Sequence, residues 1–408
     1  MRKPIYMDNS ATTRVSDAAL DAMLPLFAES YGNPSALYDM GQDAFKALED
    51  ARASVAVSLG ALKSEIFFTS GGTESDNWAI VSAAEAAGPK KRHMVCSAVE
   101  HNAVLKPLQW LESKGWEVTA LAPDSTGAVS PEALDGAIRP DTALVTLMAA
   151  NNVVGTLNDV KALAAVCRAR RVLFHTDAVQ AAGHVPVDVR DWDADMVSLS
   201  AHKFHGPKGA GALFSRIPRR PAPLVRGGGQ EKGTRSGTEN VPGAVGLAAA
   251  LAEAARLMPR DSARLSAMRD RIIQGALGIP GVVLTGDPAR RLPGHASFVV
   301  EGIRHSALLI NMLNSLGVCA SSGSACTAGS KEADHVLLAL GYGWEPFASL
   351  RLSLSPYNTD EEVDFLLEAL PGCIRELRGA WPTAFRASRA RPARGGGEDA
   401  SRGKLQSE

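Results

Sequence analysis

Seven short apolar segments between residues 65 and 215 alternate with longer amphipathic segments. The short segments are apolar nearly throughout and rich in β-branched and aromatic residues, which is typical of strands covered on both faces. They are EIFFTS (65–70), HMVCSA (93–98), WEVTAL (116–121), TALVTLMA (142–149), VLFHTD (172–177), DMVSLS (195–200) and GALFS (211–215). The alternation predicts an α/β fold in which helices cover a large, mostly parallel sheet.

The pattern changes twice after the predicted sheet. A glycine-rich connector at 226–243 leads into a helical segment and then a smaller α+β unit. We predict a large domain at 15–255, and a small domain formed by 1–14 with 256–378. The last thirty residues, 379–408, hold six basic and three acidic side chains with little apolar periodicity, which predicts a disordered tail.

Composition narrows the function classes. The net charge of −1 gives no global reason to expect nucleic-acid or membrane binding. We find no N-terminal apolar region and no run near the roughly 18 apolar residues that span a bilayer. The five cysteines lack CxxC spacing, which argues against a disulfide framework and a cysteine-based zinc site. We therefore expect a cytoplasmic protein with reduced thiols and no intrinsic metal.

Polar residues interrupt the apolar segments at their carboxyl ends, where open α/β sheets bind ligands. The candidates are Gly72 and Thr73, His101, Asn151 and Asn152, Asp177 and Gln180, and Ser200 through Lys203. Each alone has an ordinary interpretation as a turn, a helix cap or a surface residue. The pair His202 and His205 supplies too few ligands for zinc.

Together these residues have the chemistry that pyridoxal phosphate requires. That cofactor needs a lysine for its aldehyde, an acid for the pyridine nitrogen, donors for the phosphate and a flat ring against its face. Lys203 and Asp177 fall at the ends of successive predicted strands. The candidate set is Lys203, Asp177, Thr73 with Ser200 and His202, and His101.

One cysteine has an unusual setting. Cys326 lies in SSGSACTAGS (321–330), a run of small and polar residues that predicts a mobile surface loop. Because cysteine is usually buried, a displayed thiol indicates chemistry rather than packing. Cys319, Cys96 and Cys167 lie in apolar settings and are expected to be packing residues.

In combination, these motifs resemble the cysteine desulfurases, a family of fold-type I, class V aminotransferase-like pyridoxal phosphate enzymes. The resemblance covers residues 5 to 370 and includes SAHKFHGPKGAGAL, FHTDAVQAAG, FFTSGGTESDN, VEHNAV, RSGTEN and SSGSACTAGS. The SSGSAC form is similar to the subgroup of nitrogen-fixation and housekeeping enzymes. GDPARRLPGHAS (286–297) and GTENVPG (237–243) further resemble the nitrogen-fixation (NifS-type) branch.

The resemblance implies a role for each matching residue. Lys203 is the Schiff-base lysine, Cys326 the persulfide-forming cysteine and His101 the ring-stacking acid/base. The implied cofactor contacts are Gly72, Thr73, His101, Asn152, Asp177, Gln180, Ser200, Ala201, His202, Lys203 and, from a neighbouring subunit, Thr238. Asn152 and Arg351 would hold the substrate carboxylate. Val153 departs from the acidic residue common in the family.

The implied reaction converts L-cysteine to L-alanine and leaves a persulfide on Cys326 for a sulfur-acceptor or iron–sulfur scaffold protein. We expect a homodimer that supplies iron–sulfur cluster assembly, foremost for nitrogenase maturation, with housekeeping assembly or thiolation as the alternative. The only metal contact expected is a transient iron–sulfur one through Cys326. Another pyridoxal phosphate lyase or aminotransferase would not need Cys326. A non-catalytic scaffold would have lost Lys203, Asp177 or Arg351, all of which are present.

Overall fold

The computed structural model describes residues 4–216, 222–323, 334–343 and 347–379. The predicted tail, apart from Gly379, and the loop position of Cys326 lie outside these residues.

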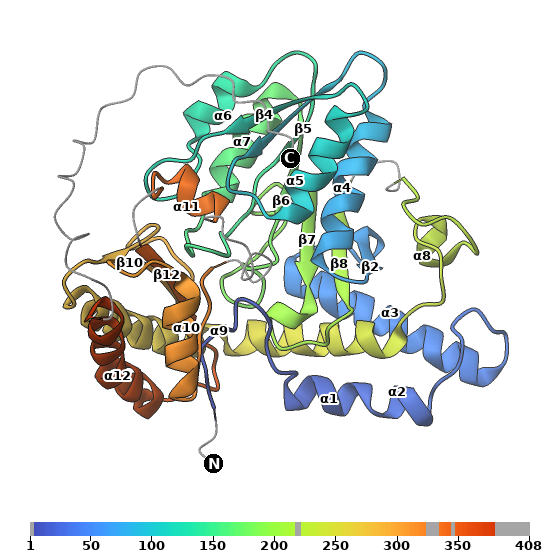
Figure 1. The fold of residues 1–408 in the computed structure, drawn as a ribbon. Coiled ribbons are helices and arrows are strands. Elements are labelled where there is room, and N and C mark those ends of the chain that lie inside the picture. Colours follow the sequence, from blue (N-terminus) through green and yellow to red (C-terminus); the bar gives the residue numbers. More distant parts are fainter. Residues whose placement is uncertain (1–3, 217–221, 324–333, 344–346, 380–408) are drawn as a thin grey trace.

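A seven-stranded sheet forms the centre of the larger unit (Figure 1). Its order is β2 (Ile66–Thr69), β8 (Gly211–Ser215), β7 (Met196–Ser200), β6 (Leu173–Asp177), β5 (Thr142–Thr146), β3 (His93–Ser97) and β4 (Glu117–Leu121). All strands are parallel except β8, which runs antiparallel to both neighbours. The seven predicted strands and the mostly parallel α/β sheet are therefore confirmed.

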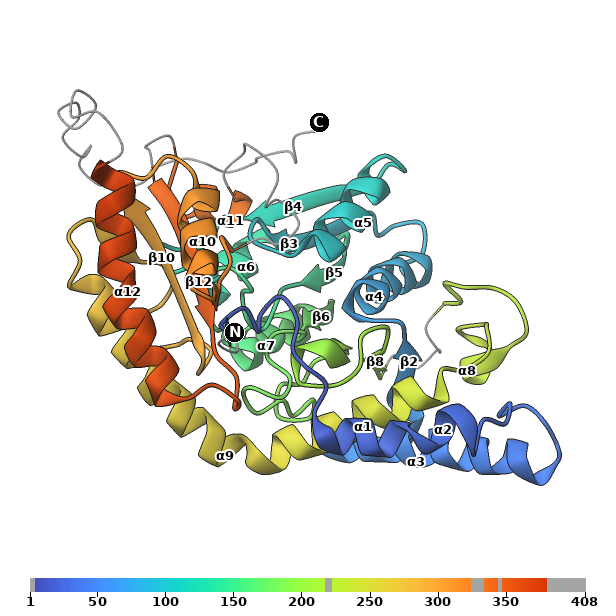
Figure 2. The ribbon, with the colours of Figure 1, turned by 60° about the horizontal axis from the view of Figure 1, so that its bottom comes forward.

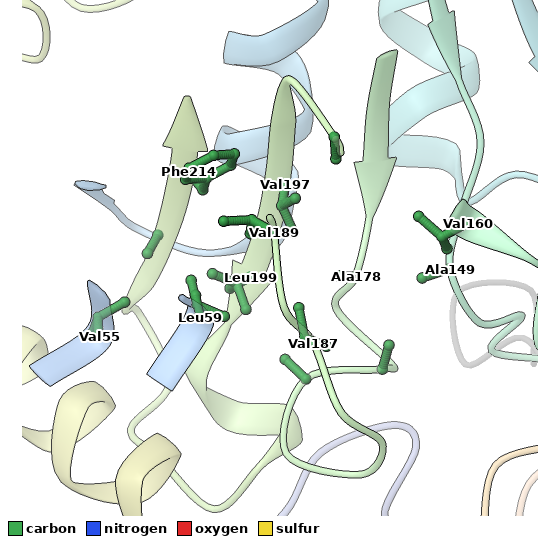
Figure 3. Close-up of a cluster of buried hydrophobic side chains, with 14 of the residues drawn as sticks. Val55, Leu59, Ala149, Val160, Ala178, Val187, Val189, Val197, Leu199 and Phe214 are labelled. Carbon is green, nitrogen blue, oxygen red and sulfur yellow. The ribbon is translucent and has the colours of Figure 1, made fainter. Parts of the chain in front are cut away.

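Helices cover both faces of this sheet, and alternate strand residues point to opposite faces. Val197 and Phe214 belong to one apolar cluster (Figure 3), whereas Met196 and Leu213 belong to the other. The first cluster includes residues of α3 (Asp39–Leu59), α6 (Pro131–Ala137) and α7 (Val160–Arg170). The second includes residues of α4 (Gly72–Ala86) and α5 (Asn102–Glu112). Burial on both faces explains why six of the strands are apolar nearly throughout, whereas the edge strand β4 is mostly half-buried.

A second sheet and a second core form the smaller unit. The sheet is antiparallel in the order β12 (Phe347–Ser353), β10 (His295–Glu301) and β9 (Val282–Leu284). Its core contains buried residues of α10 (Ser306–Ser315) and α12 (Asp360–Gly379), among them Leu309 and Leu366. The remaining elements are β1 (Ile5–Tyr6), β11 (Val318–Cys319), α1 (Asp17–Met23), α2 (Pro25–Ala28), α8 (Gln230–Gly233), α11 (His335–Ala339) and the 3-10 turns Lys63–Glu65 and Ala201–Lys203.

The 37-residue helix α9 (Val241–Leu277) joins the two units (Figure 2). Leu247 and Leu251 are buried in the core of the large sheet, and Leu265 and Ile272 in that of the small sheet. Among the described residues, α9 is the one helix long and apolar enough to cross a membrane by length and composition, a test that the core helix of a soluble protein also passes. Its apolar residues are needed on several sides because α9 packs against α1, α3 and α12. We propose domains at 15–255 and at 1–14 with 256–378, a boundary inside α9.

The N-terminal segment crosses from one unit to the other. β1 pairs in parallel with β11, and Met7 and Asn9 exchange backbone hydrogen bonds with Ser353 of β12. A few residues later, the Thr13 N–H donates to the carbonyl of His202 in the large unit. The chain between these anchors, residues 8 to 12, therefore passes over the carboxyl ends of the central strands.

Candidate active site

A cavity of about 290 Å³ lies at the carboxyl ends of β5, β6 and β7, beside the first turn of α4. Its position is the one expected for a ligand site in an open α/β sheet. The N-terminal segment and β12 contribute to its wall. The predicted site residues that line it are Gly72, Thr73, His101, Asn152, Asp177, Gln180, Ser200, His202, Lys203 and Arg351.

Three predicted site residues are not in this lining. Ala201 is fully buried behind the cavity, at the start of the turn that carries Lys203. Thr238 is exposed in the connector before α9. Cys326 lies outside the described residues. The structure thus brings together the residues predicted for the cofactor and the substrate carboxylate within one subunit.

Lys203 follows β7 and is partly buried at the cavity. Its Nζ donates to the backbone carbonyls of Ser10 at 2.7 Å and Ala11 at 2.8 Å. His184 Nε2 donates to the carbonyl of Lys203 at 2.9 Å. Lys203 is therefore an amine held inside a pocket, not a solvated surface lysine. Sequence reasoning missed Ser10 and Ala11, since backbone acceptors leave no side-chain pattern.

Asp177 ends β6, beside the strand that leads to Lys203, and its carboxylate accepts a hydrogen bond from Val179 N–H at 2.8 Å. Burial raises the Asp177 pKa, while the nearby His101 and Lys203 oppose that rise. Asp76 of α4 is a second buried acid in the lining, which sequence reasoning did not single out. Burial and the Asp177 charge raise the Asp76 pKa well above its ordinary value. Of the two acids, Asp177 is the one whose charged form is favoured by neighbouring positive groups, His101 and Lys203.

The two histidines predicted for the site are neutral bases. His101 caps α5, and its Nδ1 accepts from Ala103 N–H at 3.1 Å, which places the proton of the neutral ring on Nε2. Burial lowers the His101 pKa, although the charge of Asp177 opposes the shift. Burial also lowers the His202 pKa, to about 4, and its Nδ1 lies 3.1 Å from Thr12 Oγ1. Both rings are thus uncharged near neutral pH.

The first turn of α4 is shaped to receive an anion. A Cβ on Gly72 would lie 2.6 Å from Val179 Cγ2, so only glycine lets the backbone come this close. Helix N-termini offer unpaired N–H groups and a favourable dipole to phosphate. Thr73 and Ser200, with His202, place hydroxyl and imidazole groups around the same part of the cavity.

Arg351 supplies a buried positive charge on the other side of the cavity. Its side chain is 2% exposed, and Nη1 donates to the carbonyls of Asn152, at 2.8 Å, and Gly323. Nη2 donates to Asp8 Oδ1 at 2.7 Å. A planar guanidinium suits a carboxylate ligand because it can bind both oxygens at once.

Val153, the departure from the family pattern, is an apolar packing residue. It is 1% exposed and belongs to a small cluster with Val99, Val154, Val299, Val336 and Leu337. A Cβ placed on Gly323 would lie 3.0 Å from Val153 Cγ1. Val153 therefore packs against Gly323 and the helix α11, which are the described parts of the chain before and after the cysteine loop.

His335 and Asp334 of this region also line the cavity, although the sequence did not single them out. His335 Nε2 donates to the carbonyl of Glu100 at 3.0 Å, and Asp334 caps α11 through a bond from Val336 N–H. Burial raises the Glu100 pKa well above its ordinary value.

The described residues contain no cluster of three or more His, Cys, Asp or Glu able to hold a metal ion.

These residues fit pyridoxal phosphate. The cavity has an amine for the aldehyde, a buried acid for the ring nitrogen, and a helix start with hydroxyl donors for the phosphate. His101 adds a neutral imidazole beside them. The buried Arg351 leaves a cation for a substrate carboxylate.

Comparison with known proteins gives a consistent result. Residues 5–366 match the model of the aminotransferase class-V family. The chain is 47% identical to a cysteine desulfurase IscS of Methanosarcina thermophila over 93% of this chain and 94% of that protein. It is 43% identical to the cysteine desulfurase NifS of Azotobacter vinelandii over 93% of this chain and 94% of that one. A solved NifS-like protein superposes with a TM-score of 0.86 at 38% identity, covering 91% of this chain and all of that chain.

Proposed function

The chain belongs to the aminotransferase class-V family and is a pyridoxal phosphate-dependent cysteine desulfurase, and from this premise we propose how its residues divide the reaction. The main support for the proposal is that one cavity is lined by four residues, Lys203, Asp177, His101 and Arg351. An amine, a charged acid, a neutral imidazole and a buried guanidinium are the groups that this chemistry on an amino acid requires.

Binding and proton transfer follow from the positions of these groups. When bound, pyridoxal phosphate supplies a reactive aldehyde and a ring that accepts electrons from the substrate. Lys203 Nζ would hold the cofactor through its aldehyde and, when free, would take the proton from the substrate Cα. Asp177 would pair with the ring nitrogen and keep it protonated, since His101 and Lys203 oppose the rise that burial causes in the Asp177 pKa. Arg351 and Asn152 hold the L-cysteine carboxylate.

Sulfur transfer is assigned to Cys326. Its thiolate attacks the sulfur of L-cysteine, an S–S bond forms, and the substrate C–S bond breaks. The electron pair of that bond stays with the substrate Cβ, which takes a proton to become the methyl group of L-alanine. The neutral His101, with its proton on Nε2, is placed to donate and accept protons during these steps.

The reaction is tested with the purified protein, pyridoxal phosphate and L-cysteine under anaerobic conditions. We expect alanine in proportion to sulfur released when a thiol reductant regenerates the enzyme. An aminotransferase would instead form a keto acid and convert the cofactor to its amine form. Keto acid without alanine would contradict the assignment.

We propose that the sulfur supplies iron–sulfur cluster assembly through an acceptor or scaffold protein. Nitrogenase maturation is the narrower candidate, supported by the likeness to NifS proteins, and housekeeping assembly is supported by the likeness to IscS proteins. Deleting the gene tests which of these two roles the enzyme has. A nitrogenase-specific enzyme would cost growth on N₂ only, whereas a housekeeping enzyme would lower iron–sulfur enzyme activities with fixed nitrogen as well.

We also propose a homodimer in the cytoplasm. Support for the dimer is a group of exposed large apolar side chains between residues 20 and 45, on α1, α2, the start of α3 and the segments between these helices. They are Leu20, Leu24, Phe27, Tyr31, Leu37, Tyr38 and Phe45. Thr238 is exposed and outside the cavity of its own chain, as a residue serving a neighbouring subunit would be. The free thiols of Cys96, Cys167, Cys319 and Cys373 suit a reducing compartment.

A further inference from the structure

The guanidinium of Arg351 is bound on most of its perimeter by protein groups. Of its five N–H donors, both on Nη1 are used by the carbonyls of Asn152 and Gly323. One on Nη2 donates to Asp8 Oδ1 at 2.7 Å. Nε–H has no partner among the described residues. Nε and Nη2 share one edge of the planar group, the edge at which a carboxylate can meet two nitrogens at once.

Asp8 is the only acidic group that the described residues place in contact with this guanidinium. It comes from the N-terminal segment, 343 residues away in sequence, and its side chain is 21% exposed. The two carbonyls on Nη1 accept hydrogen bonds but carry no full charge. Asp8 therefore contributes the strongest single restraint on the rotation of the Arg351 side chain.

The position of Asp8 is itself well determined. Ser353 N–H donates to the carbonyl of Met7 at 2.8 Å, and Asn9 Nδ2 donates to the carbonyl of Ser353 at 2.8 Å. These bonds attach both neighbours of Asp8 to β12, the strand that carries Arg351. The acid and the arginine are thus held on adjacent pieces of backbone.

We propose that Asp8 is a positioning residue for the substrate carboxylate: it holds Nη2 of Arg351 so that the remaining edge of the guanidinium faces the cavity. This inference rests on the proposed role of Arg351. Asp8 does not touch the substrate, and its effect passes through Arg351. It should therefore concern ligands that have a carboxylate and leave other amines unaffected.

The test compares Asp8→Ala, Asp8→Asn and a matched control, Asp17→Ala, in the cofactor-loaded enzyme. Asp17 makes an exposed ion pair with Arg14 on the same N-terminal part of the chain, away from the cavity. The measurements are KM and kcat for L-cysteine, and the dissociation constants of L-alanine and ethylamine from the cofactor spectrum. Ethylamine is L-alanine without its carboxylate.

Asp8→Ala should raise KM and weaken L-alanine binding about tenfold, which corresponds to about 1.4 kcal/mol, with a smaller change in kcat. Asp8→Asn should recover only part of the loss, because its amide oxygen accepts from Nη2 but carries no full charge. Ethylamine binding should be equal in all variants, and Asp17→Ala should match the parent protein.

An unchanged or lower KM in Asp8→Ala would overturn the proposal, since a lower value would mean that Asp8 competes with the substrate. Equal weakening of L-alanine and ethylamine would also overturn it, because the change would then be a general distortion. Arg351→Ala separates the premise from the inference. If this variant binds L-alanine normally, the role of Arg351 fails; if it weakens L-alanine and Asp8→Ala does not, only the role of Asp8 fails.

Discussion

The side-chain amine of Lys203 donates a 2.7 Å hydrogen bond to the carbonyl of Ser10, a residue 193 positions earlier in the chain. Gln180 Nε2 donates to the same carbonyl at 2.9 Å. The N-terminal segment therefore contacts the proposed Schiff-base lysine from the side opposite the strands. This contact keeps the amine in the cavity, where it can meet an aldehyde.

Lys203→Ala should lose the covalent attachment of pyridoxal phosphate, because no other lysine among the described residues lines the cavity. The measurement is cofactor fixed to the protein after borohydride reduction, located by peptide mass spectrometry. Lys208→Ala is the matched control, an exposed lysine five positions later that does not line the cavity. Label retained in Lys203→Ala would show that another lysine binds the cofactor.

Asp177→Asn should lower kcat by roughly two orders of magnitude or more, since an uncharged partner leaves the ring nitrogen unprotonated and the ring a poor electron acceptor. Asp76→Asn should stay within about tenfold of the parent enzyme. Burial and the Asp177 charge raise the Asp76 pKa, which favours its neutral form, and an amide has nearly the shape of a protonated carboxyl group. The measurement is the steady-state rate of each variant. A larger loss of kcat in Asp76→Asn than in Asp177→Asn would assign the ring nitrogen to Asp76 instead of Asp177.

Cys326→Ala should bind pyridoxal phosphate and L-cysteine but form no alanine, because the cofactor and carboxylate contacts do not involve the loop thiol. Cys319→Ala should remain active and lose about 1 kcal/mol of stability from a small cavity beside β1. After brief exposure to L-cysteine, mass spectrometry should find one added sulfur atom on the peptide with Cys326. An adduct on Cys319, or turnover by Cys326→Ala, would reject the assignment.

Glu100→Gln should become more stable relative to the parent as pH rises above about 4.5, the ordinary pKa of the side chain. Burial raises the Glu100 pKa in the folded protein, so above that pH the folded state keeps a proton that the unfolded state has released. Folding stability of the parent then falls with pH, by up to about 1.4 kcal/mol per unit for one proton, whereas glutamine has no such term. Urea unfolding midpoints from about pH 4 to about pH 8 measure the difference.

Two features make Glu100→Gln a clean comparison. Glu100 Oε1 accepts from Met148 N–H at 3.0 Å, a bond that the glutamine oxygen can keep. Glu132→Gln, at an exposed position, controls for loss of a surface charge. Parallel pH profiles for the parent and Glu100→Gln would mean that Glu100 is ionised in the folded protein.

Phe27→Glu should shift the protein from dimer to monomer, because Phe27 is 60% exposed within the apolar group on α1 to α3 and a buried carboxylate there would be costly. Light scattering after size-exclusion chromatography gives the mass. Glu132→Gln should remain dimeric. A parent protein that is an active monomer at working concentration would contradict the proposed dimer, and with it the role of Thr238 in a neighbouring subunit.

The seven strands and the polar residues at their ends could be predicted from the sequence, because both are local features. Strands buried on two faces are apolar along most of their length and ligand-binding residues follow closely, so Asp177 and Lys203 stand out at or just after strand ends. The antiparallel direction of β8 leaves no such local mark. The burial of α9 in two separate cores leaves no local mark either, because its apolar residues indicate only a long helix.

Which distant groups complete the site depends on the tertiary structure. Asp8 and Arg351 meet because β1 and the residues after it are hydrogen-bonded beside β11 and β12, a pairing set by backbone groups that every residue shares. The Asp76 pKa is raised because the fold buries this side chain of α4 near Asp177. Its sequence context, TESDN, is that of an ordinary helix start. The protonation state of a carboxyl group depends on its distance to other charges and to water, and folding alone sets those distances.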